Sequence, residues 1–171
     1  SRHKAAFSKV VLGGCATVDP TPDYERARAA VDSATGDDSL FQPGDEEQVA
    51  ERVAQLLEGG LTAAESVSIS LMNNGTLQAL LYEIGVSRAD AVQSGLLSNP
   101  SLDAVVLFPL GSGSTTTELG LVQNFIELWQ IAPRRRLARN ELERTVLEVA
   151  HTAANVAADA KMNYVRAASA G

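Results

Sequence analysis

Residues near the C-terminus follow a 4-3-4-3 spacing without interruption, and this pattern restricts the possible folds more than any other feature of the chain. The members of this stripe are Leu142, Val146, Val149, Ala153, Val156, Ala160, Asn163 and Ala167. A parallel stripe beside it contains Leu147, Ala150, Ala154, Ala157, Lys161 and Tyr164. Two adjacent heptad stripes predict one long helix over 135–169 that packs against neighbours on two sides, as in a barrel wall or a bundle.

A second long helix is predicted over 62–97. Thr62 and Glu65 form a T-x-x-E capping box at its start. Its two stripes are partly polar and consist of Val67, Leu71, Asn74, Gln78 and Leu81, and of Leu77, Leu80, Ile84, Ser87 and Ala91. Pro100 and Pro133 are expected to stop the two long helices. At about 1.5 Å per residue each helix spans roughly 50 Å, so the molecule should be elongated.

Two extended runs, 101–109 and 117–126, separate these helices. Leu102, Ala104, Val106 and Phe108 alternate with Ser101, Asp103, Val105 and Leu107, and Leu119, Leu121, Gln123 and Phe125 alternate with Glu118, Gly120, Val122 and Asn124. Each run is therefore apolar on one face and mixed on the other. This length and alternation are typical of strands in a transmembrane β-barrel. A water-facing strand pair packed on a helix has the same alternation, so both interpretations stay open.

The segment after the second run has the composition of a membrane interface. Trp129 suits an interfacial aromatic girdle. Four arginines follow it, at Arg134, Arg135, Arg136 and Arg139. Cations near a helix start oppose the helix dipole, whereas anionic lipid headgroups attract them. We therefore predict that Trp129 and the arginines lie at the membrane surface.

Residues 1–15 have the layout of an export signal. Arg2 and Lys4 precede a short apolar run, and small residues precede Cys15. The sequence LGGC at 12–15 resembles a bacterial lipoprotein cleavage box, in which the thiol receives an acyl chain. We predict that Cys15 is lipidated. The alternative is a frayed N-terminus with an incidental cysteine.

Residues 16–60 are predicted to form a linker with short helices. Its first part is rich in Asp, Pro, Thr, Ser and Gly, with at most a short helix begun by Thr21-Pro22, and it should need no core. An amphipathic helix is expected over 46–58. The acids at its start satisfy the helix dipole, so they do not require a metal ion.

Composition and motifs argue against several classes of function. The net charge is −7 and the pI about 4.8, which disfavours a nucleic-acid partner. The GSGS sequence at 111–114 lacks the lysine of a phosphate-binding loop. His3 and His151 have no patterned nucleophile or metal-ligand partners nearby. We expect no enzyme activity, no cofactor and no metal site.

The order of these parts resembles the N-terminal half of the TolC-like outer-membrane efflux protein family. The sequence LTAAESVSISLMNN resembles the family's opening helix, and SRADAVQSGLLSNPSL resembles the passage from that helix to the first strand. ELGLVQNFIEL resembles the second strand, and the run from Arg134 to Ala167 resembles the descending helix. The resemblance covers about 61–169, and the cysteine box agrees with a lipoprotein member of the family.

The resemblance implies a mainly α protein with a β-hairpin, in which 61–171 forms one repeat of a channel with a membrane β-barrel and a periplasmic α-barrel. It implies a homotrimer in the bacterial outer membrane that meets a periplasmic adaptor protein and an inner-membrane pump. Such a channel is a passive conduit for the export of small molecules or metal ions. Asp103 and Glu118 would line its lumen and favour cations.

The chain also departs from the family pattern. Family members carry two helix–hairpin–helix repeats, and this sequence contains one, so we expect either a truncated subunit or assembly of more copies. An isolated hairpin has unpaired edges that lipid cannot satisfy. The alternative function is a soluble periplasmic α-hairpin that binds partner proteins through its heptad stripes and has no pore activity.

Overall fold

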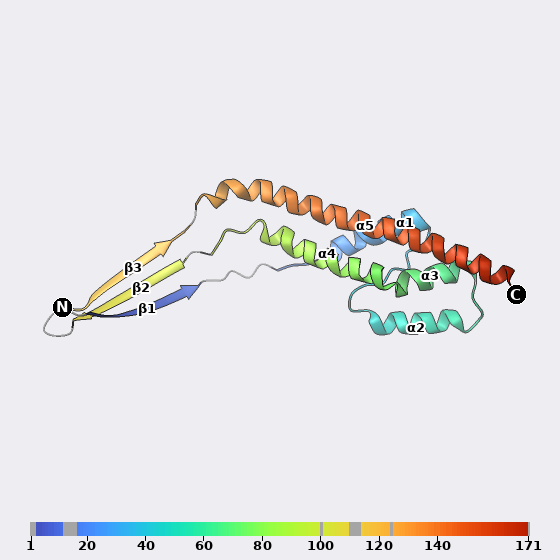
Figure 1. Cartoon of the computed structure of the whole chain (residues 1–171), viewed down its shortest axis with the longest axis horizontal. Helices are drawn as coiled ribbons and strands as arrows, with labels where there is room; N and C mark the ends of the chain where they lie inside the picture. The colour runs from blue at the N-terminus through green and yellow to red at the C-terminus, as the bar shows by residue number, and fades with distance from the viewer. Residues whose placement is uncertain (1–2, 12–16, 100, 110–113, 124, 171) are drawn as a thin grey trace.

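The molecule consists of a helical body and a three-stranded sheet that projects from one end of it (Figure 1). The computed structural model describes residues 3–11, 17–99, 101–109, 114–123 and 125–170. The expected fold class, mainly α with an antiparallel hairpin between helices, is confirmed. The sheet additionally contains a third strand near the N-terminus.

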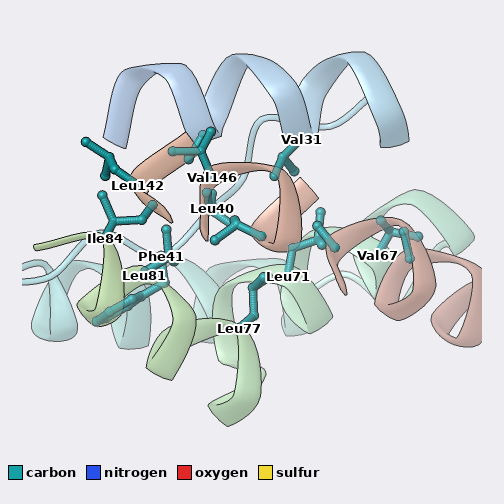
Figure 2. Close-up of a cluster of buried hydrophobic side chains, with 14 residues drawn as sticks. Val31, Leu40, Phe41, Val67, Leu71, Leu77, Leu81, Ile84, Leu142 and Val146 are labelled. Atoms are coloured by element: carbon teal, nitrogen blue, oxygen red, sulfur yellow. The ribbon is translucent and has the colours of Figure 1, made fainter. Parts of the chain in front are cut away.

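Helix α5 (Glu127–Ser169) is the element on which the body is built. Helices α1 (Thr21–Thr35), α3 (Ala63–Asn73) and α4 (Gly75–Gln93) all pack against it. Its buried residues are Leu142, Thr145, Val146, Val149, Ala153 and Ala157. Four of these belong to the first predicted heptad stripe, because a helix that packs along its length buries that spacing. Figure 2 shows the aliphatic side chains that converge from these helices.

The predicted helix over 62–97 is interrupted. Asn74 has an extended backbone (φ −80°, ψ 115°), and its side chain accepts a hydrogen bond from the Leu77 amide at 3.0 Å. The Gln78 side-chain amide donates to the Met72 carbonyl at 3.0 Å and bridges the break. An asparagine that caps a new helix start competes with helix continuation, which explains why two helices form in place of one.

The expectation that Pro133 stops the second long helix is wrong. Helix α5 begins at Glu127, eight residues before the predicted start at 135, and contains Pro133. Proline at this position removes the amide that would bond to the carbonyl of residue 129, and its ring crowds that carbonyl. Pro133 and Trp129 are both exposed, so water can satisfy that carbonyl. Helix α5 therefore passes through the proline.

The segment around α1 is part of the core, which corrects the expectation of a coreless linker. Ala27 and Val31 are fully buried against the other helices. Asp23 is also buried, and its carboxylate pairs with Arg26 at 3.3 Å and with Arg88 at 3.7 Å. Arg26 in turn pairs with Glu143 on α5. This charge network joins α1, α4 and α5. The low hydrophobicity of the α1 sequence gave no indication of this attachment.

Helix α2 (Glu46–Leu57) matches the predicted amphipathic helix and packs more loosely than the others. It contacts α3 and has no fully buried residue. Its Glu46 carboxylate accepts a hydrogen bond from the Tyr82 hydroxyl of α4 at 2.8 Å. This polar contact and the partly buried Val49 hold α2 on the side of the body.

The sheet has the order β1-β2-β3 and is antiparallel throughout. Strand β2 (Ser101–Pro109) lies in the centre, β1 (His3–Val11) pairs with it on one side, and β3 (Thr116–Val122) pairs on the other. Strand β2 has the predicted bounds, and β3 ends four residues before the predicted end at 126. Strand β1 lies within residues 1–15, which were predicted to be an export signal. The presence of a strand does not test that prediction.

Truncation of one leucine on α5 tests the packing of the body. Leu142→Ala should lower the free energy of unfolding by about 2–5 kcal/mol, because Leu142 is 4% exposed and its removal leaves a cavity. Leu147→Ala is the matched control on the same helix, and since Leu147 is 58% exposed it should change stability by less than about 0.5 kcal/mol. Urea unfolding followed by circular dichroism measures both. Equal losses for the two variants would contradict the assignment of the core face.

Asp37 should make stability depend on pH. Burial acts to raise the pKa of Asp37, but hydrogen bonds from Ser68 and Ser39 outweigh it and hold the pKa below the usual value. A lowered folded-state pKa stabilises the protein above the unfolded pKa of about 3.9, and this stabilisation is lost as pH falls through the folded value. The stability difference between wild type and Asp37→Asn should therefore be largest above about pH 5 and shrink in acid. Asp38→Asn, at an exposed neighbour, is the control. A difference that is constant with pH would contradict the role of Asp37.

Candidate functional site

The sheet is the part of the molecule that the body leaves uncovered. Across the described ranges, no helix packs against β2 or β3, and Figure 1 shows the sheet extending away from the helices. Hydrogen bonds join its base to the body: the Ser98 amide donates to Glu127 at 3.1 Å, and the Gln123 side chain donates to the Ser98 carbonyl at 3.1 Å. The bond from Ser98 also lowers the pKa of Glu127. The sheet is thus fixed at one end, and β3 is exposed along its length.

The strand register separates two chemically different faces of β2 and β3. Leu102 pairs with Leu121, and Ala104 pairs with Leu119. Because paired residues share a face, the apolar face consists of Leu102, Ala104, Val106, Phe108, Leu119 and Leu121, with Thr117 at its outer end. Leu119 is 74% exposed and Leu121 is 71% exposed. Such large exposed aliphatic side chains on one surface mark an interaction site with an apolar partner.

The mixed face carries the two acids that were predicted to line a pore. It consists of Ser101, Asp103, Val105, Leu107, Thr116, Glu118, Gly120 and Val122. Asp103 pairs with Gly120, and Glu118 pairs with Val105, so the two carboxylates occupy diagonal positions on one surface. The structure therefore places Asp103 and Glu118 on the same face, opposite the leucines. Their role in ion selection remains a prediction.

A second exposed apolar group lies where β3 leads into α5. It consists of Phe125, Ile126, Leu128, Trp129 and Leu137. Trp129 is 87% exposed, the largest exposed fraction among these residues. The prediction singled out Trp129 alone, and the run F-I-x-L-W at 125–129 is the sequence signal that would have identified its neighbours. Exposed apolar side chains thus occur both on the sheet and at the start of the long helix.

The predicted arginines do not all have the same surroundings. The Arg134 guanidinium donates to the Gln130 carbonyl at 3.4 Å and to the Glu127 carbonyl at 3.5 Å. The Arg135 guanidinium lies against Gly95, where a side chain on residue 95 would collide with it. Arg136 and Arg139 are exposed on α5. Arg134 and Arg135 therefore contact the protein, whereas Arg136 and Arg139 face its surroundings.

An open pocket of about 550 Å³ lies beside Arg134 at the junction of sheet and body, and its lining includes Val18, Val92, Leu96 and Glu127. Its walls combine aliphatic side chains with the uncharged polar residues Gln93, Ser98 and Asn99, one acid and one base. In the described part of the chain, no three His, Cys, Asp or Glu residues gather in a way that could hold a metal ion. His151 is exposed and lies 3.3 Å from the Asn155 side chain.

Two further observations concern the membrane prediction. No helix in the described ranges is both long enough and apolar enough to cross a bilayer. Cys15, the predicted lipidation site, lies outside the described residues. Comparisons with known protein families, with curated proteins and with solved structures found no match to this chain.

Proposed function

We propose that this chain supplies one helix–hairpin–helix repeat of an outer-membrane efflux channel. The sheet would form part of a membrane β-barrel, and the helices would form part of a periplasmic conduit for small molecules or metal ions. The subunits would be a homo-oligomer, a trimer if the full-length chain carries a second repeat, and would meet a periplasmic adaptor and an inner-membrane pump. The observation that carries this proposal is that β2 and β3 are not covered by any helix of the described chain and have one apolar face.

Burial energetics favour lipid as the partner of the apolar face. Moving an exposed leucine out of water stabilises it by about 1.5–3 kcal/mol. Leu119 and Leu121 are both mostly exposed, and Leu102 and Phe108 are exposed on the adjacent strand. The nine residues of β2 correspond to about 30 Å, close to the thickness of the hydrocarbon layer. The apolar face has the size and chemistry of a lipid-facing barrel segment.

The opposite face suits a water-filled lumen. Its Asp103, Glu118 and Thr116 are polar, as side chains on the inner surface of a transmembrane barrel usually are. In a closed ring of repeats these carboxylates would recur around the pore and favour cations. Each additional repeat would also supply backbone partners to the edge of β3 that faces away from β2, since an open edge is not tolerated in lipid.

The soluble α-hairpin alternative has less support from the geometry. It requires the strand pair to pack on the side of its own helices, so that its apolar residues are shielded from water. In the described ranges the strands instead extend from the end of the body with those residues exposed. This arrangement favours the channel proposal.

Two lysine substitutions on neighbouring residues of β3 test the proposal. Leu119→Lys should reduce incorporation into phospholipid vesicles, because a lysine on the lipid-facing side of a barrel costs about 2–4 kcal/mol. Glu118→Lys should incorporate like wild type, since residue 118 faces the lumen, and should weaken the cation preference of the conductance. Vesicle flotation measures incorporation. Trp129, the chain's single tryptophan, should shift its emission to the blue as the protein inserts.

The pair of variants separates the two functions. Equal flotation of Leu119→Lys and Glu118→Lys would contradict a lipid-facing apolar face. A wild-type chain that stays monomeric and unbound, with Trp129 emission unchanged by vesicles, would support the soluble α-hairpin instead.

Lipidation of Cys15 is tested separately. Cells that express the chain with its native N-terminal segment should incorporate labelled palmitate into wild type, because the thiol of a lipoprotein box is the acylated group. Cys15→Ala should carry no label at equal expression. Label that persists on Cys15→Ala would rule out this anchor and would leave the channel proposal standing.

A further inference from the structure

The first third of α5 carries a concentrated positive charge in an otherwise acidic protein. Residues 128–140 contain four arginines and no acid, whereas the chain as a whole has a net charge of −7. This segment directly follows the sheet along the chain. The charge is therefore located at the junction between the proposed membrane part and the helical body.

Two of the four arginines are available to an external ligand. Arg134 donates to backbone carbonyls of its own helix, and Arg135 lies against Gly95 near the end of α4. Within the described part of the chain, Arg136 and Arg139 make no hydrogen bond and no ion pair. Both are exposed, and they are three residues apart, which makes them neighbours on the helix surface.

Trp129 and Arg136 lie on the same side of α5. They are seven residues apart, which is two helical turns or about 10 Å along the axis. Leu142 and Val149 lie toward the side of the helix opposite Trp129, whereas Arg139 lies between the two sides, about 60° around the helix from Arg136 and in line with Val146. Along α5 away from the sheet, the exposed side chains thus change from the apolar group that contains Trp129 to a stretch with the unpaired Arg136 and Arg139, with the exposed Leu137 between them. Hydrocarbon, interface and phosphate layers of a phospholipid leaflet follow the same order.

We propose that Arg136 and Arg139 bind the phosphate groups of anionic phospholipid at the surface of the leaflet, with Trp129 positioned just inside it. This inference rests on the proposed membrane insertion of the sheet. Guanidinium groups match phosphate oxygens with paired hydrogen bonds, and both arginines are free to form them. The cluster would fix how deeply the chain enters the membrane, because it resists passage below the phosphate layer.

Vesicle binding of the full chain tests this site. Partitioning is measured on phosphatidylcholine vesicles with and without phosphatidylglycerol. The Arg136→Gln/Arg139→Gln double variant should lose about 25-fold of the affinity for anionic vesicles, at about fivefold per arginine, and should bind neutral vesicles like wild type. Raised salt should reduce wild-type binding to anionic vesicles toward the level of this variant.

The matched control makes the same change of charge elsewhere on α5. Arg144 and Arg166 are exposed on the part of the helix that lies away from the sheet, so Arg144→Gln/Arg166→Gln should change anionic binding less than about twofold. Circular dichroism of each variant checks that the helical body is intact, as expected for substitutions of exposed residues.

The outcomes distinguish this site from the proposed function. Equal losses in the two double variants would overturn the phosphate site, since net charge would then explain the effect. A larger loss in Arg134→Gln/Arg135→Gln than in Arg136→Gln/Arg139→Gln would also overturn it. Absence of wild-type binding to neutral vesicles would count against insertion of the sheet. If phosphatidylglycerol still increased binding, and if this increase required Arg136 and Arg139, the phosphate site would be supported on its own.

Discussion

Packing on one face of α5 is the interaction on which the rest of the structure depends. Helices α1, α3 and α4 meet on this face, where small side chains such as Ala153 and Ala157 allow close approach and Val146 and Val149 fill the interior. At 43 residues α5 spans about 64 Å, so one continuous helix links the far end of the body to the base of the sheet. The sheet therefore projects from a rigid support.

The two parts of the molecule differ in how far their apolar side chains are shielded from water. The body buries Leu71, Leu77, Leu81 and Ile84 among its own helices and needs no partner to do so. The sheet leaves Leu119 and Leu121 exposed and has no helix of the described chain over either face of β2 and β3. Because water disfavours such a surface, the sheet is the part of the molecule for which we propose an external partner.

The regular parts of the fold were predictable because their patterns are local. Heptad spacing identified α5, alternation identified β2 and its pairing with β3, and the capping box at Thr62 identified the start of α3. The break at Asn74 was missed because the heptad stripe continues across it, and only the side-chain cap shows the interruption. A short helix begun by Thr21-Pro22 was predicted, but its packing in the core was missed, because the attachment of α1 depends on Asp23, Arg88 and Glu143, which are far apart in the sequence. The different surroundings of Arg135 and Arg136 likewise depend on Gly95, a contact that no spacing rule indicates.

The central claim is that the apolar face of β3 contacts lipid tails while its mixed face contacts water. Spin labels placed one at a time at positions 117 to 122, in a chain with Cys15 replaced by Ala and reconstituted in vesicles, measure this most directly. Collision with oxygen, which dissolves in lipid, should be high at 117, 119 and 121 and low at 118, 120 and 122, and a water-soluble nickel reagent should give the opposite alternation. Uniform access of the nickel reagent to all six positions would contradict the account.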